Sequence, residues 1–473
     1  MAVETADREA GAVPRKEPVV PASARERMDY AIKIHREGKT AEALAIYREV
    51  AHDVRDHPRF WTLLGSALRS EGNIGAAVAC QMRAVELDPE SLDSFGNLQN
   101  ALRSTGRYAE ALDLADRCTA RKYTEFHRQF DRARDLERLE RYTEAIAAYD
   151  RAIELRPERE DLLFLRALAI LGGGRFAAGL REYRHRWKYK DVTKPPRPSP
   201  EWDGSAQPGR SVAVIGEQGL GDFILTSRYL PRLAEMFGHV KLVLRRPLCR
   251  LYENLDHIDE VVERSEEKRR TEDTHLFTMD LLRHFDARPG NVPPPATLNV
   301  PVTARQRASK LLAGGERRLR IGIAWAGSPT YSNAAHRDVA VEHFITLAEV
   351  PGVQLYSLYK GAREGDLTTS GAIGLIDNIA ASERDLADTA AVIDELDLVI
   401  TTDTSIAHLS ASLGQRTWCL LHMPAFWYWG SHGERTDWYP TMRLVRQTSI
   451  GDWTEVFARV RRDLKNLMDT ETR

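Results

Sequence analysis

Apolar and polar positions follow two different patterns in the two halves of the chain. Up to about Lys190, apolar residues recur with the spacing of helices, and small residues return every 34 positions. One series, at the expected helix turns, is Gly38, Gly72, Gly106, Glu140 and Gly174. A second series in the same register is Ala43, Ala77, Ala111, Ala145 and Gly179. The first half therefore predicts stacked helix pairs, each with a turn and a close helix crossing.

A 34-residue period of helix pairs is typical of tetratricopeptide repeats. We expect about five units between Arg25 and Lys190, because one unit cannot bury its apolar face alone. Such a solenoid presents a concave groove, which usually binds a peptide or protein segment. A structural spacer or a dimerisation arm is the alternative interpretation of the same repeats.

The second half alternates short strands with helices. The expected strands are 211–215, 241–244, 260–262, 275–277, 320–325, 353–358, 419–421 and the run that ends before Asp403, and a helix is expected from Phe223 to Met236. Proline-rich stretches at 194–200 and 292–295 interrupt the pattern. The first is expected to be a stiff connector that Trp202 pins to the next domain. Two βα series separated by a break predict two Rossmann-like lobes with a cleft between them.

The predicted fold class is thus an α-helical tetratricopeptide solenoid followed by an α/β unit with two Rossmann-like lobes. We expect a disordered tail at 1–24, repeats at 25–190, a linker at 191–210, a first lobe at 211–310 and a second lobe at 311–473. A chain that starts near Pro200 is expected to keep both lobes with their own cores.

Composition narrows the classes of function. The formal net charge of −2 gives no general attraction to nucleic acid or to an anionic membrane. No run approaches the roughly 18 apolar residues of a transmembrane helix, and the polar first residues lack the apolar core of a secretory signal. The four cysteines show neither disulfide nor zinc-site spacing. We therefore expect a cytoplasmic protein with no transmembrane segment and no nucleic-acid partner.

The most informative segment runs from Leu396 to His408. A buried parallel strand is expected to end at Asp403, and a helix begins at once with Thr404 and Ser405 in its first turn. The N–H groups and positive dipole end of such a helix suit a phosphate, and His408 lies one turn further on. The competing interpretation is an ordinary helix cap by Asp403 or Thr404, with His408 packed in the core.

A second candidate loop follows the first strand of the first lobe. It reads Gly216-Glu217-Gln218-Gly219-Leu220-Gly221-Asp222, and its glycines let backbone approach a ligand closely. Their spacing differs from the dinucleotide-binding fingerprint, and the chain has no Walker A loop. Asp222 is expected at the mouth of the cleft and at a helix start, where it either takes a proton or caps the helix.

These features together resemble bacterial tetratricopeptide-repeat glycosyltransferases. The resemblance rests on the repeats, the exit from Leu180 to Trp187, the Gln218-Gly219-Leu220-Gly221-Asp222 loop and the segment from Asp403 to His408. The second half is similar to glycosyltransferase family 9, the heptosyltransferases, and more distantly to the protein O-GlcNAc transferases. The resemblance implies a GT-B fold with an acceptor lobe, a nucleotide-sugar lobe, and a final helix (about Asp452 to Met468) that returns to the first lobe.

The resemblance also implies roles for single residues. Asp222 would be the base, Thr404, Ser405 and His408 would hold the donor diphosphate, and Arg337 would neutralise it. Heptosyltransferases usually have lysine at the position of Arg337 and glycine at that of Ser405. Further candidate contacts to nucleotide or acceptor are Gln218, Gly219, Gly221, Lys360, Asp403 and Trp427.

Two of these contacts have a competing structural explanation. Lys360 is as well explained by a surface lysine, and the aromatic run that holds Trp427 by a core cluster under a loop. No Asp-x-Asp pair of the metal-dependent GT-A type occurs. We therefore expect no metal and no cofactor, with a nucleotide-sugar as co-substrate.

The favoured function is transfer of a sugar from a nucleotide-sugar to a protein acceptor bound by the repeats. Flagellin is a candidate acceptor, because related fused proteins serve flagellar glycosylation. One alternative is a transferase for lipopolysaccharide or another glycan, with the repeats used for assembly. The other is a non-catalytic tetratricopeptide scaffold, although Asp222, Arg337, Thr404 and His408 are all present.

Overall fold

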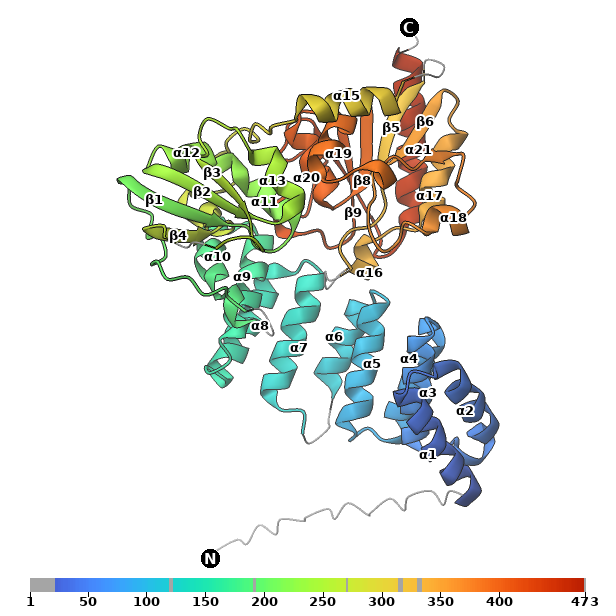
Figure 1. Cartoon of the computed structure of the whole chain (residues 1–473). Coiled ribbons are helices and arrows are strands. Elements are labelled where there is room, and N and C mark those ends of the chain that lie inside the picture. Colours follow the sequence, from blue (N-terminus) through green and yellow to red (C-terminus); the bar gives the residue numbers. More distant parts are fainter. Residues whose placement is uncertain are drawn as a thin grey trace, which may run out of the picture. The chain divides into compact units, whose positions relative to one another are not determined.

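The computed structural model describes residues 22–118, 122–189, 193–268, 271–313, 318–329 and 334–471 (Figure 1). The chain divides into two compact units, one ending at Leu136 and one beginning at Glu137. Residues 1–21 of the predicted disordered tail (1–24) lie outside the described residues. Helix α1 begins at Ala22, before the predicted start of the repeats at Arg25.

Helices fill the described part of the chain up to Glu182. They are α1 Ala22–Arg36, α2 Thr40–Val54, α3 Pro58–Ser70, α4 Ile74–Leu87, α5 Leu92–Ser104, α6 Tyr108–Arg117, α7 Glu125–Arg138, α8 Tyr142–Leu155, α9 Asp161–Gly172 and α10 Phe176–Glu182, and a 3-10 helix η1 (Tyr183–Lys188) follows. These helices form five successive pairs, which confirms the predicted repeats.

The turn residues of the five pairs all adopt the left-handed backbone region. Their φ angles are 84° at Gly38, 78° at Gly72, 73° at Gly106, 57° at Glu140 and 77° at Gly174. Glycine is favoured there because it has no Cβ, and Glu140 adopts the same turn at a steric cost. In the second series, a Cβ added to Gly179 would lie 2.5 Å from Cγ of Leu171. Small residues therefore set how closely the helices of each pair approach.

The first lobe is a four-stranded parallel sheet with strand order β3-β2-β1-β4. Its elements are β1 Gln207–Ile215, α11 Leu220–Thr226, η2 Ser227–Tyr229, α12 Leu230–Ala234, β2 Phe237–Leu244, α13 Arg246–Tyr252, β3 Glu260–Glu263, β4 Thr274–Phe277 and α14 Asp280–His284. The prediction of a single helix from Phe223 to Met236 is wrong, because this segment is not one continuous helix. It is divided into α11, η2 and α12, since Pro231 has no N–H to continue a helix.

The second lobe is a six-stranded parallel sheet with strand order β10-β9-β8-β5-β6-β7. Its elements are α15 Val302–Leu311, β5 Leu319–Ala324, α16 Ala334–Arg337, α17 Val341–Ile345, η3 Thr346–Glu349, β6 Val353–Ser357, α18 Asp366–Thr369, β7 Ile376–Asp377, η4 Ala380–Ser382, α19 Leu386–Ile393, β8 Leu398–Thr402, α20 Ser405–Ser412, β9 Thr417–Leu421, η5 Trp427–Trp429, β10 Met442–Arg446 and α21 Trp453–Glu471. Two parallel α/β sheets after a helical repeat region confirm the predicted fold class.

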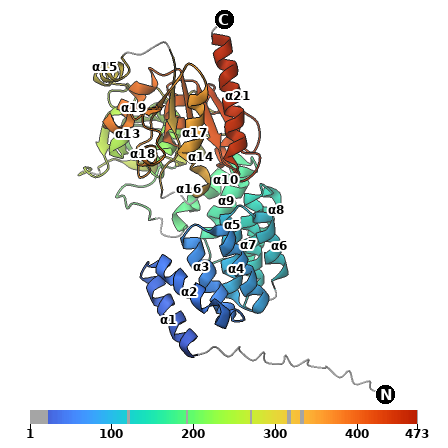
Figure 2. The same ribbon diagram turned by 90° about the vertical axis from the view of Figure 1, so that its right-hand side faces the viewer.

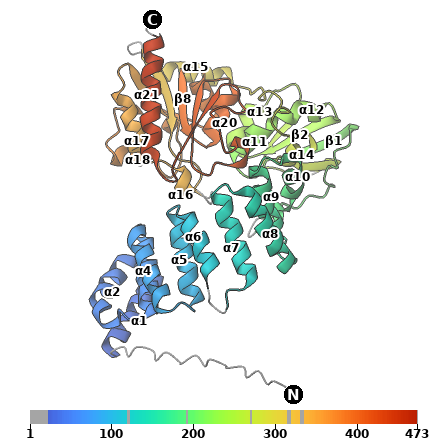
Figure 3. The ribbon, with the colours of Figure 1, turned by 180° about the vertical axis from the view of Figure 1, so that it is seen from behind.

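Helix α21 does not return to the first lobe as the resemblance implied. It packs on the second lobe, beside α17 in Figures 2 and 3, with Phe457 against Phe344 and Arg461 paired with Glu349. Its buried side chains form one stripe along the helix: Trp453, Val456, Phe457, Val460 and Leu464. The second lobe covers this apolar stripe, so α21 has no further apolar face that could pack on the first lobe.

Helix α15 also belongs to the second lobe by its contacts. It packs on α19, with Ser309 hydrogen-bonded to Glu395 and Arg305 paired with Asp394. The boundary predicted between residues 310 and 311 assigned almost all of this helix to the first lobe, and its contacts correct that assignment. Every helix of the described residues is too short or too polar to cross a membrane.

The connector between repeats and lobes is fixed where the sequence suggested. Trp202 is 3% exposed and packs against Phe237 and His284 of the first lobe. Its backbone N–H donates to the carbonyl of His275 at 2.8 Å. Strand β1 begins at Gln207, before the predicted start at Ser211, so the end of the predicted linker is already part of the sheet.

The lobes do not have a core separate from the last repeat, which overturns the expectation for a chain that starts near Pro200. Leu171, Leu180 and Tyr183 of the repeats lie in one continuous apolar cluster with the strands of both lobes. Trp187 packs on Phe277 at a ring distance of 4.6 Å. Residues before Pro200 therefore complete the interior of the α/β part.

Candidate functional site

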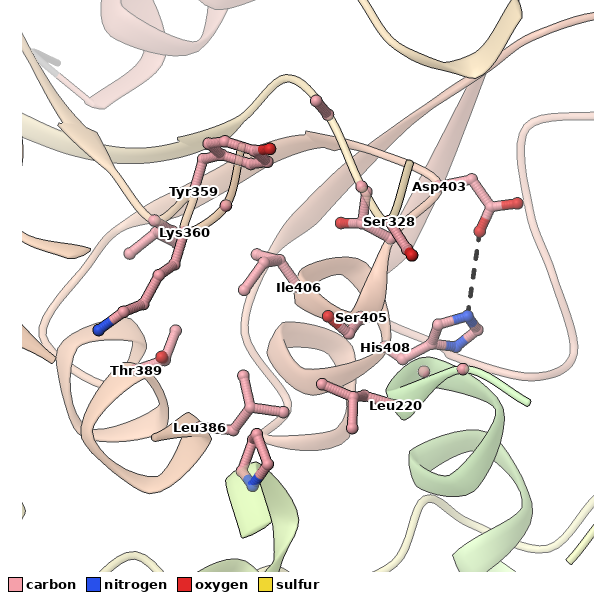
Figure 4. A pocket seen from close by; sticks show the side chains of 18 of the residues that line it. Leu220, Ser328, Tyr359, Lys360, Leu386, Thr389, Asp403, Ser405, Ile406 and His408 are labelled. Atoms are coloured by element: carbon pink, nitrogen blue, oxygen red, sulfur yellow. Dashed lines mark ion pairs between the residues drawn. The ribbon is translucent and has the colours of Figure 1, made fainter. Parts of the chain in front are cut away.

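A cleft of about 720 Å³ lies between the two lobes. Among its lining residues are all but one of those proposed from the sequence: Gln218, Gly219, Gly221, Asp222, Arg337, Lys360, Asp403, Thr404, Ser405 and His408. Figure 4 shows Lys360 and Thr389 on one side of this cleft, and Asp403 and His408 on the other, with Ser405 and Ile406 between them. The fold thus brings together residues that lie far apart in the sequence.

Sheet topology explains why these residues meet. In an open parallel sheet, a crevice forms where neighbouring strands send their connections in opposite directions. Strand β5 lies between β8 and β6, so the loops after β5 and β8 open such a crevice in the second lobe. In the first lobe the corresponding pair is β1 and β4. Arg337, Asp403 and Asp222 follow β5, β8 and β1 respectively, and all three reach the cleft.

The start of α20 forms one wall of the cleft. Thr404 is its N-cap residue and makes no side-chain cap bond, although its Oγ1 lies 3.2 Å from Oγ1 of Thr401. The first N–H groups of a helix have no acceptor within the helix and carry its positive dipole end. The hydroxyls of Thr404 and Ser405 and these N–H groups therefore form a surface that could hold an anion.

Arg337 supplies positive charge at the same wall. Its side chain is 8% exposed, and it donates to the carbonyl of Ser328 at 3.1 Å and to Asp338 at 3.3 Å. A Cβ on Gly327 would come within 2.4 Å of the guanidinium, so glycine leaves room for it. Part of the loop that carries Arg337, residues 330–333, lies outside the described residues.

Asp403 and His408 form a buried polar pair behind this surface. Asp403 Oδ1 lies 3.9 Å from His408 Nε2, and His408 Nδ1 lies 3.1 Å from the hydroxyl of Tyr439. Burial lowers the pKa of His408 to about 3, so the imidazole is neutral at pH 7. Burial raises the pKa of Asp403 to about 6, opposed by the charge of Arg337. His408 can contribute a neutral N–H to a ligand, not a positive charge.

Asp222 faces this surface from the first lobe. Its Oδ2 accepts a hydrogen bond from the N–H of Gly219 at 2.8 Å, so the carboxylate also caps α11. Burial raises the pKa of Asp222 to about 6, a rise that the Gly219 N–H opposes and the nearby Asp403 carboxylate reinforces. A carboxylate with such a pKa is ionised at neutral pH and is a stronger base than an ordinary aspartate. The helix cap and the base are therefore compatible roles.

Gly221 sets how closely the two lobes approach at the site. A Cβ at this position would lie 2.6 Å from Cδ2 of His408 and 3.3 Å from Cα of Ser405. Helices α11 and α20 are also in extensive contact. The missing side chain of Gly221 therefore lets the two lobes pack closely at the cleft.

We predict that Gly221→Ala destabilises the protein by about 1–3 kcal/mol, because the added methyl group overpacks the contact with α20. Thermal unfolding of the full chain measures this change. Gly365→Ala is the matched control, since a Cβ there meets nothing within 4 Å. An equal melting temperature for both variants would contradict the assigned role of Gly221.

The opposite end of the cleft contains groups that the sequence did not single out. Glu383 is 6% exposed, and its Oε2 accepts a hydrogen bond from Thr389 Oγ1 at 2.6 Å. Its Oε1 has no hydrogen-bond partner among the described residues. Burial raises the pKa of Glu383 to about 7. Lys360 Nζ donates to the backbone carbonyl of Glu383. Glu383 and Lys360 both line this end of the cleft, which therefore combines a buried carboxyl group with an ammonium group.

Arg245 is a further cleft residue that the sequence analysis missed. It directly follows β2, and the carboxyl end of a parallel strand was the signal that could have identified it. Glu383 gave no comparable signal, because it follows the short η4 and not a long apolar strand.

Trp427 is the one proposed site residue that the structure removes from the cleft. It is buried against Phe176 of α10 and against Trp438. Its neighbours Phe426 and Tyr428 line the cleft instead, and the Tyr428 hydroxyl lies 3.3 Å from His408 Nε2. The direction of the side chains in the 3-10 turn η5, which the sequence does not reveal, decides which aromatic ring reaches a ligand.

Comparison with known families identifies the repeat region. Two tetratricopeptide repeat models match this chain, over residues 58–91 and residues 130–185. The chain carries tetratricopeptide repeats. The second of these matches lies mostly within the unit that also contains both lobes.

Comparison with whole proteins covers both halves. Protein FlbA of Caulobacter vibrioides is 22% identical over an alignment of 438 residues, and the match covers 85% of this chain and 72% of FlbA. The structure of the ADP-heptose lipopolysaccharide heptosyltransferase II of E. coli matches with 14% identity and a TM-score of 0.41, over 56% of this chain and 100% of that protein. A glycosyl transferase family 9 structure from Veillonella parvula matches with 13% identity and a TM-score of 0.38, over 50% of this chain and 86% of that one.

Proposed function

We propose that this protein is a glycosyltransferase that needs no metal and moves a sugar from a nucleotide-sugar to a protein acceptor. The observation that carries the proposal is the cleft itself. Asp222 lines it from the first lobe, and Arg337 and the start of α20 line it from the second. Transfer of a sugar from a diphosphate requires these two functions at one place: a base for the acceptor and positive charge for the leaving group.

In the proposed reaction, an acceptor hydroxyl attacks the anomeric carbon of the sugar. Asp222 takes the hydroxyl proton as the new carbon–oxygen bond forms. The bond between the anomeric carbon and the diphosphate oxygen breaks, and the nucleoside diphosphate leaves with the bonding electrons. Arg337, the hydroxyls of Thr404 and Ser405, and the first N–H groups of α20 stabilise the charge on the leaving group. Attack opposite the leaving group inverts the anomeric centre.

The far end of the cleft supports a nucleoside as the rest of the donor. Lys360, Glu383 and Thr389 line this end and supply polar groups for a ribose or a base. The volume of about 720 Å³ lies in the range of small-molecule and cofactor sites. Gln218, Gly219 and Gly221 then lie on the acceptor side, in the same loop as Asp222.

Binding of nucleoside diphosphates tests the donor site. We expect at least one of ADP, GDP and UDP to bind the full chain, and Arg337→Ala to weaken that binding by about 10- to 150-fold, because a charge-assisted hydrogen bond contributes about 1.5–3 kcal/mol. The matching nucleoside should lose much less. His408→Ala should have a smaller effect than Arg337→Ala, since the imidazole is neutral. Calorimetric titration measures the affinities of the wild type and both variants for the diphosphate and the nucleoside. Equal losses of affinity for the two ligands in Arg337→Ala would contradict the assignment of Arg337.

The repeats support a protein as the acceptor, because tetratricopeptide grooves usually bind peptide or protein segments. We propose that the groove recruits the acceptor in the cytoplasm, and flagellin is the first acceptor to test. An increase in acceptor mass by one sugar, seen with the wild type and not with Asp222→Asn, is the expected result. Modification of a lipid-linked glycan, with every protein acceptor unchanged, would favour the alternative of glycan assembly.

A further inference from the structure

The last turn of the repeats contacts the loop that carries the candidate base. Arg186, in η1, is 2% exposed and lies between Glu217 and Asp280 of the first lobe. Its Nε and Nη2 donate to the two carboxylate oxygens of Glu217 at 2.9 and 2.7 Å. Its Nη1 and Nη2 donate to the two oxygens of Asp280 at 3.1 and 2.9 Å. One guanidinium from the repeats thus binds two carboxylates of the first lobe with four hydrogen bonds.

Both carboxylates lie where the first sheet opens. Glu217 follows β1 and Asp280 begins the helix after β4, and these two strands are neighbours in the sheet. The Oε1 of Glu217 also accepts the N–H of Met279 at 3.1 Å. Arg186 therefore ties together the two loops at the carboxyl ends of β1 and β4.

Tyr183, in the same turn as Arg186, contacts Gln218, the residue that follows Glu217. The hydroxyl of Tyr183 lies 2.9 Å from Nε2 of Gln218 and 3.2 Å from its Oε1. Gln218 has a φ of 53°, in the left-handed region where a residue with a side chain is strained. Such a conformation persists when surrounding contacts hold it, and Tyr183 supplies one to the side chain of Gln218 itself.

The position of the base depends on this loop. Gly219 follows Gln218, and its N–H is the group that holds Asp222 Oδ2 at 2.8 Å. A change in the backbone at Gln218 moves that N–H and with it the carboxylate. Arg337 and Thr404 belong to the second lobe, where Arg337 donates to the carbonyl of Ser328 and Thr404 lies beside Thr401.

We propose that Tyr183 and Arg186 are positioning residues of the reaction. The last repeat holds residues 216–222 in the conformation that places Asp222 in the cleft. This inference rests on the proposed function, because it assigns the repeats a part in the chemistry as well as in acceptor binding. It predicts an effect on turnover without an effect on donor binding, since Tyr183 and Arg186 contact residues of the first lobe and the proposed donor contacts come from the second.

The test compares Tyr183→Phe with the wild type in the full chain. The variant loses one hydroxyl and the contact to Gln218, so it should fold. With the nucleotide-sugar that the wild type consumes, we expect kcat to fall about 2- to 10-fold, as loss of one neutral hydrogen bond would give, with KM for the donor unchanged. Hydrogen exchange should become faster at residues 216–222 and stay unchanged at β8 and β9.

Two further variants sharpen the comparison. Arg186→Lys keeps the charge but not the four-bond geometry, so kcat should fall further while KM stays unchanged; if this variant does not fold, Tyr183→Phe decides alone. Arg184→Met is the matched control, because Arg184 is an exposed residue of the same turn, and it should behave as the wild type.

Different failures have different meanings. Wild-type kcat and wild-type hydrogen exchange in Tyr183→Phe would overturn the positioning role. An equal change in kcat and in KM would also overturn it, because that result indicates a general loss of structure. If the wild type consumes no nucleotide-sugar, the proposed function fails, and hydrogen exchange at 216–222 still decides whether the repeats hold the loop.

Discussion

Asp222→Asn is expected to lower the rate of sugar transfer by about two orders of magnitude or more, because a general base contributes roughly 10²- to 10⁴-fold. Asparagine keeps the shape of the side chain and its side-chain oxygen can still accept the N–H of Gly219, so α11 stays capped. Binding of the nucleoside diphosphate should be nearly unchanged, since the proposed diphosphate contacts come from the second lobe. Initial rates and titrations on the same preparation measure both quantities.

The pH dependence of the wild type provides a separate test of the same residue. The base acts only when ionised, and the pKa of Asp222 is raised to about 6. Activity should therefore be full above this value and should fall as the pH drops through about 6, not through about 4 as for an ordinary aspartate. The neighbouring Asp403 titrates in the same range, so the limb of the profile reports both carboxylates.

A second capping aspartate serves as the control for Asp222→Asn. Asp452 accepts the N–H of Thr454 at 3.0 Å at the start of α21, away from the cleft. Asp452→Asn makes the same chemical change at a helix start and should keep the wild-type rate. If Asp222→Asn is folded and equally active, Asp222 is a helix cap and not a base.

A chain truncated to begin at Pro200 is expected to lose its folded structure or to unfold at a much lower temperature. It lacks Arg186, so Glu217 and Asp280 are left without their positive partner. Breaking a buried ion pair by removing one partner costs about 3–5 kcal/mol. It also lacks Leu171, Leu180 and Tyr183 from the common core. This expectation reverses the one drawn from the sequence.

A chain truncated to begin at Glu137 should behave differently, because it is the complete second unit. It keeps α8 to η1 with both lobes and should unfold cooperatively and bind the donor. Circular dichroism melting of the two truncated chains measures the contrast. Equal melting temperatures would contradict the assignment of the last repeat to the core of the lobes.

The longer truncated chain also separates the two enzyme functions. If the first repeats recruit a protein acceptor, it should consume the donor slowly and lose modification of that acceptor, because the effective concentration falls. Adding residues 1–136 as a separate fragment should not restore the rate but should still bind the acceptor. Modification of the natural acceptor at full rate would favour glycan assembly, with no recruitment by these repeats.

Residues at the ends of periodic elements could be predicted from the sequence. The turn series was recognised from spacing alone, and each member has a positive φ, including Glu140. Asp222 and Asp403 were found because apolar strands end just before them, and parallel strands bring their carboxyl ends to one edge. Their presence in one cleft followed from that rule. Their chemical roles remain predictions.

Residues whose position depends on packing could not be predicted. Glu383 follows two short elements without a clear period, so nothing in the sequence placed it opposite Thr389. Trp427 and Tyr428 are neighbours of similar character, and only the turn η5 decides that Tyr428 reaches the cleft. Whether α21 returns to the first lobe depends on which surface covers its apolar stripe. The ion pair between Arg186 and Glu217 joins residues from two predicted domains, which no local pattern reveals.

The most direct test of the account is to measure nucleotide release from a panel of nucleotide-sugars. The panel contains UDP-, GDP- and ADP-sugars and a CMP-sugar, with the wild type and Asp222→Asn compared, each with and without EDTA. The account predicts that the wild type consumes at least one diphosphate donor, equally well in EDTA, and that Asp222→Asn consumes it about 100-fold more slowly. If the wild type releases nucleotide from none of these donors, the cleft does not transfer sugar.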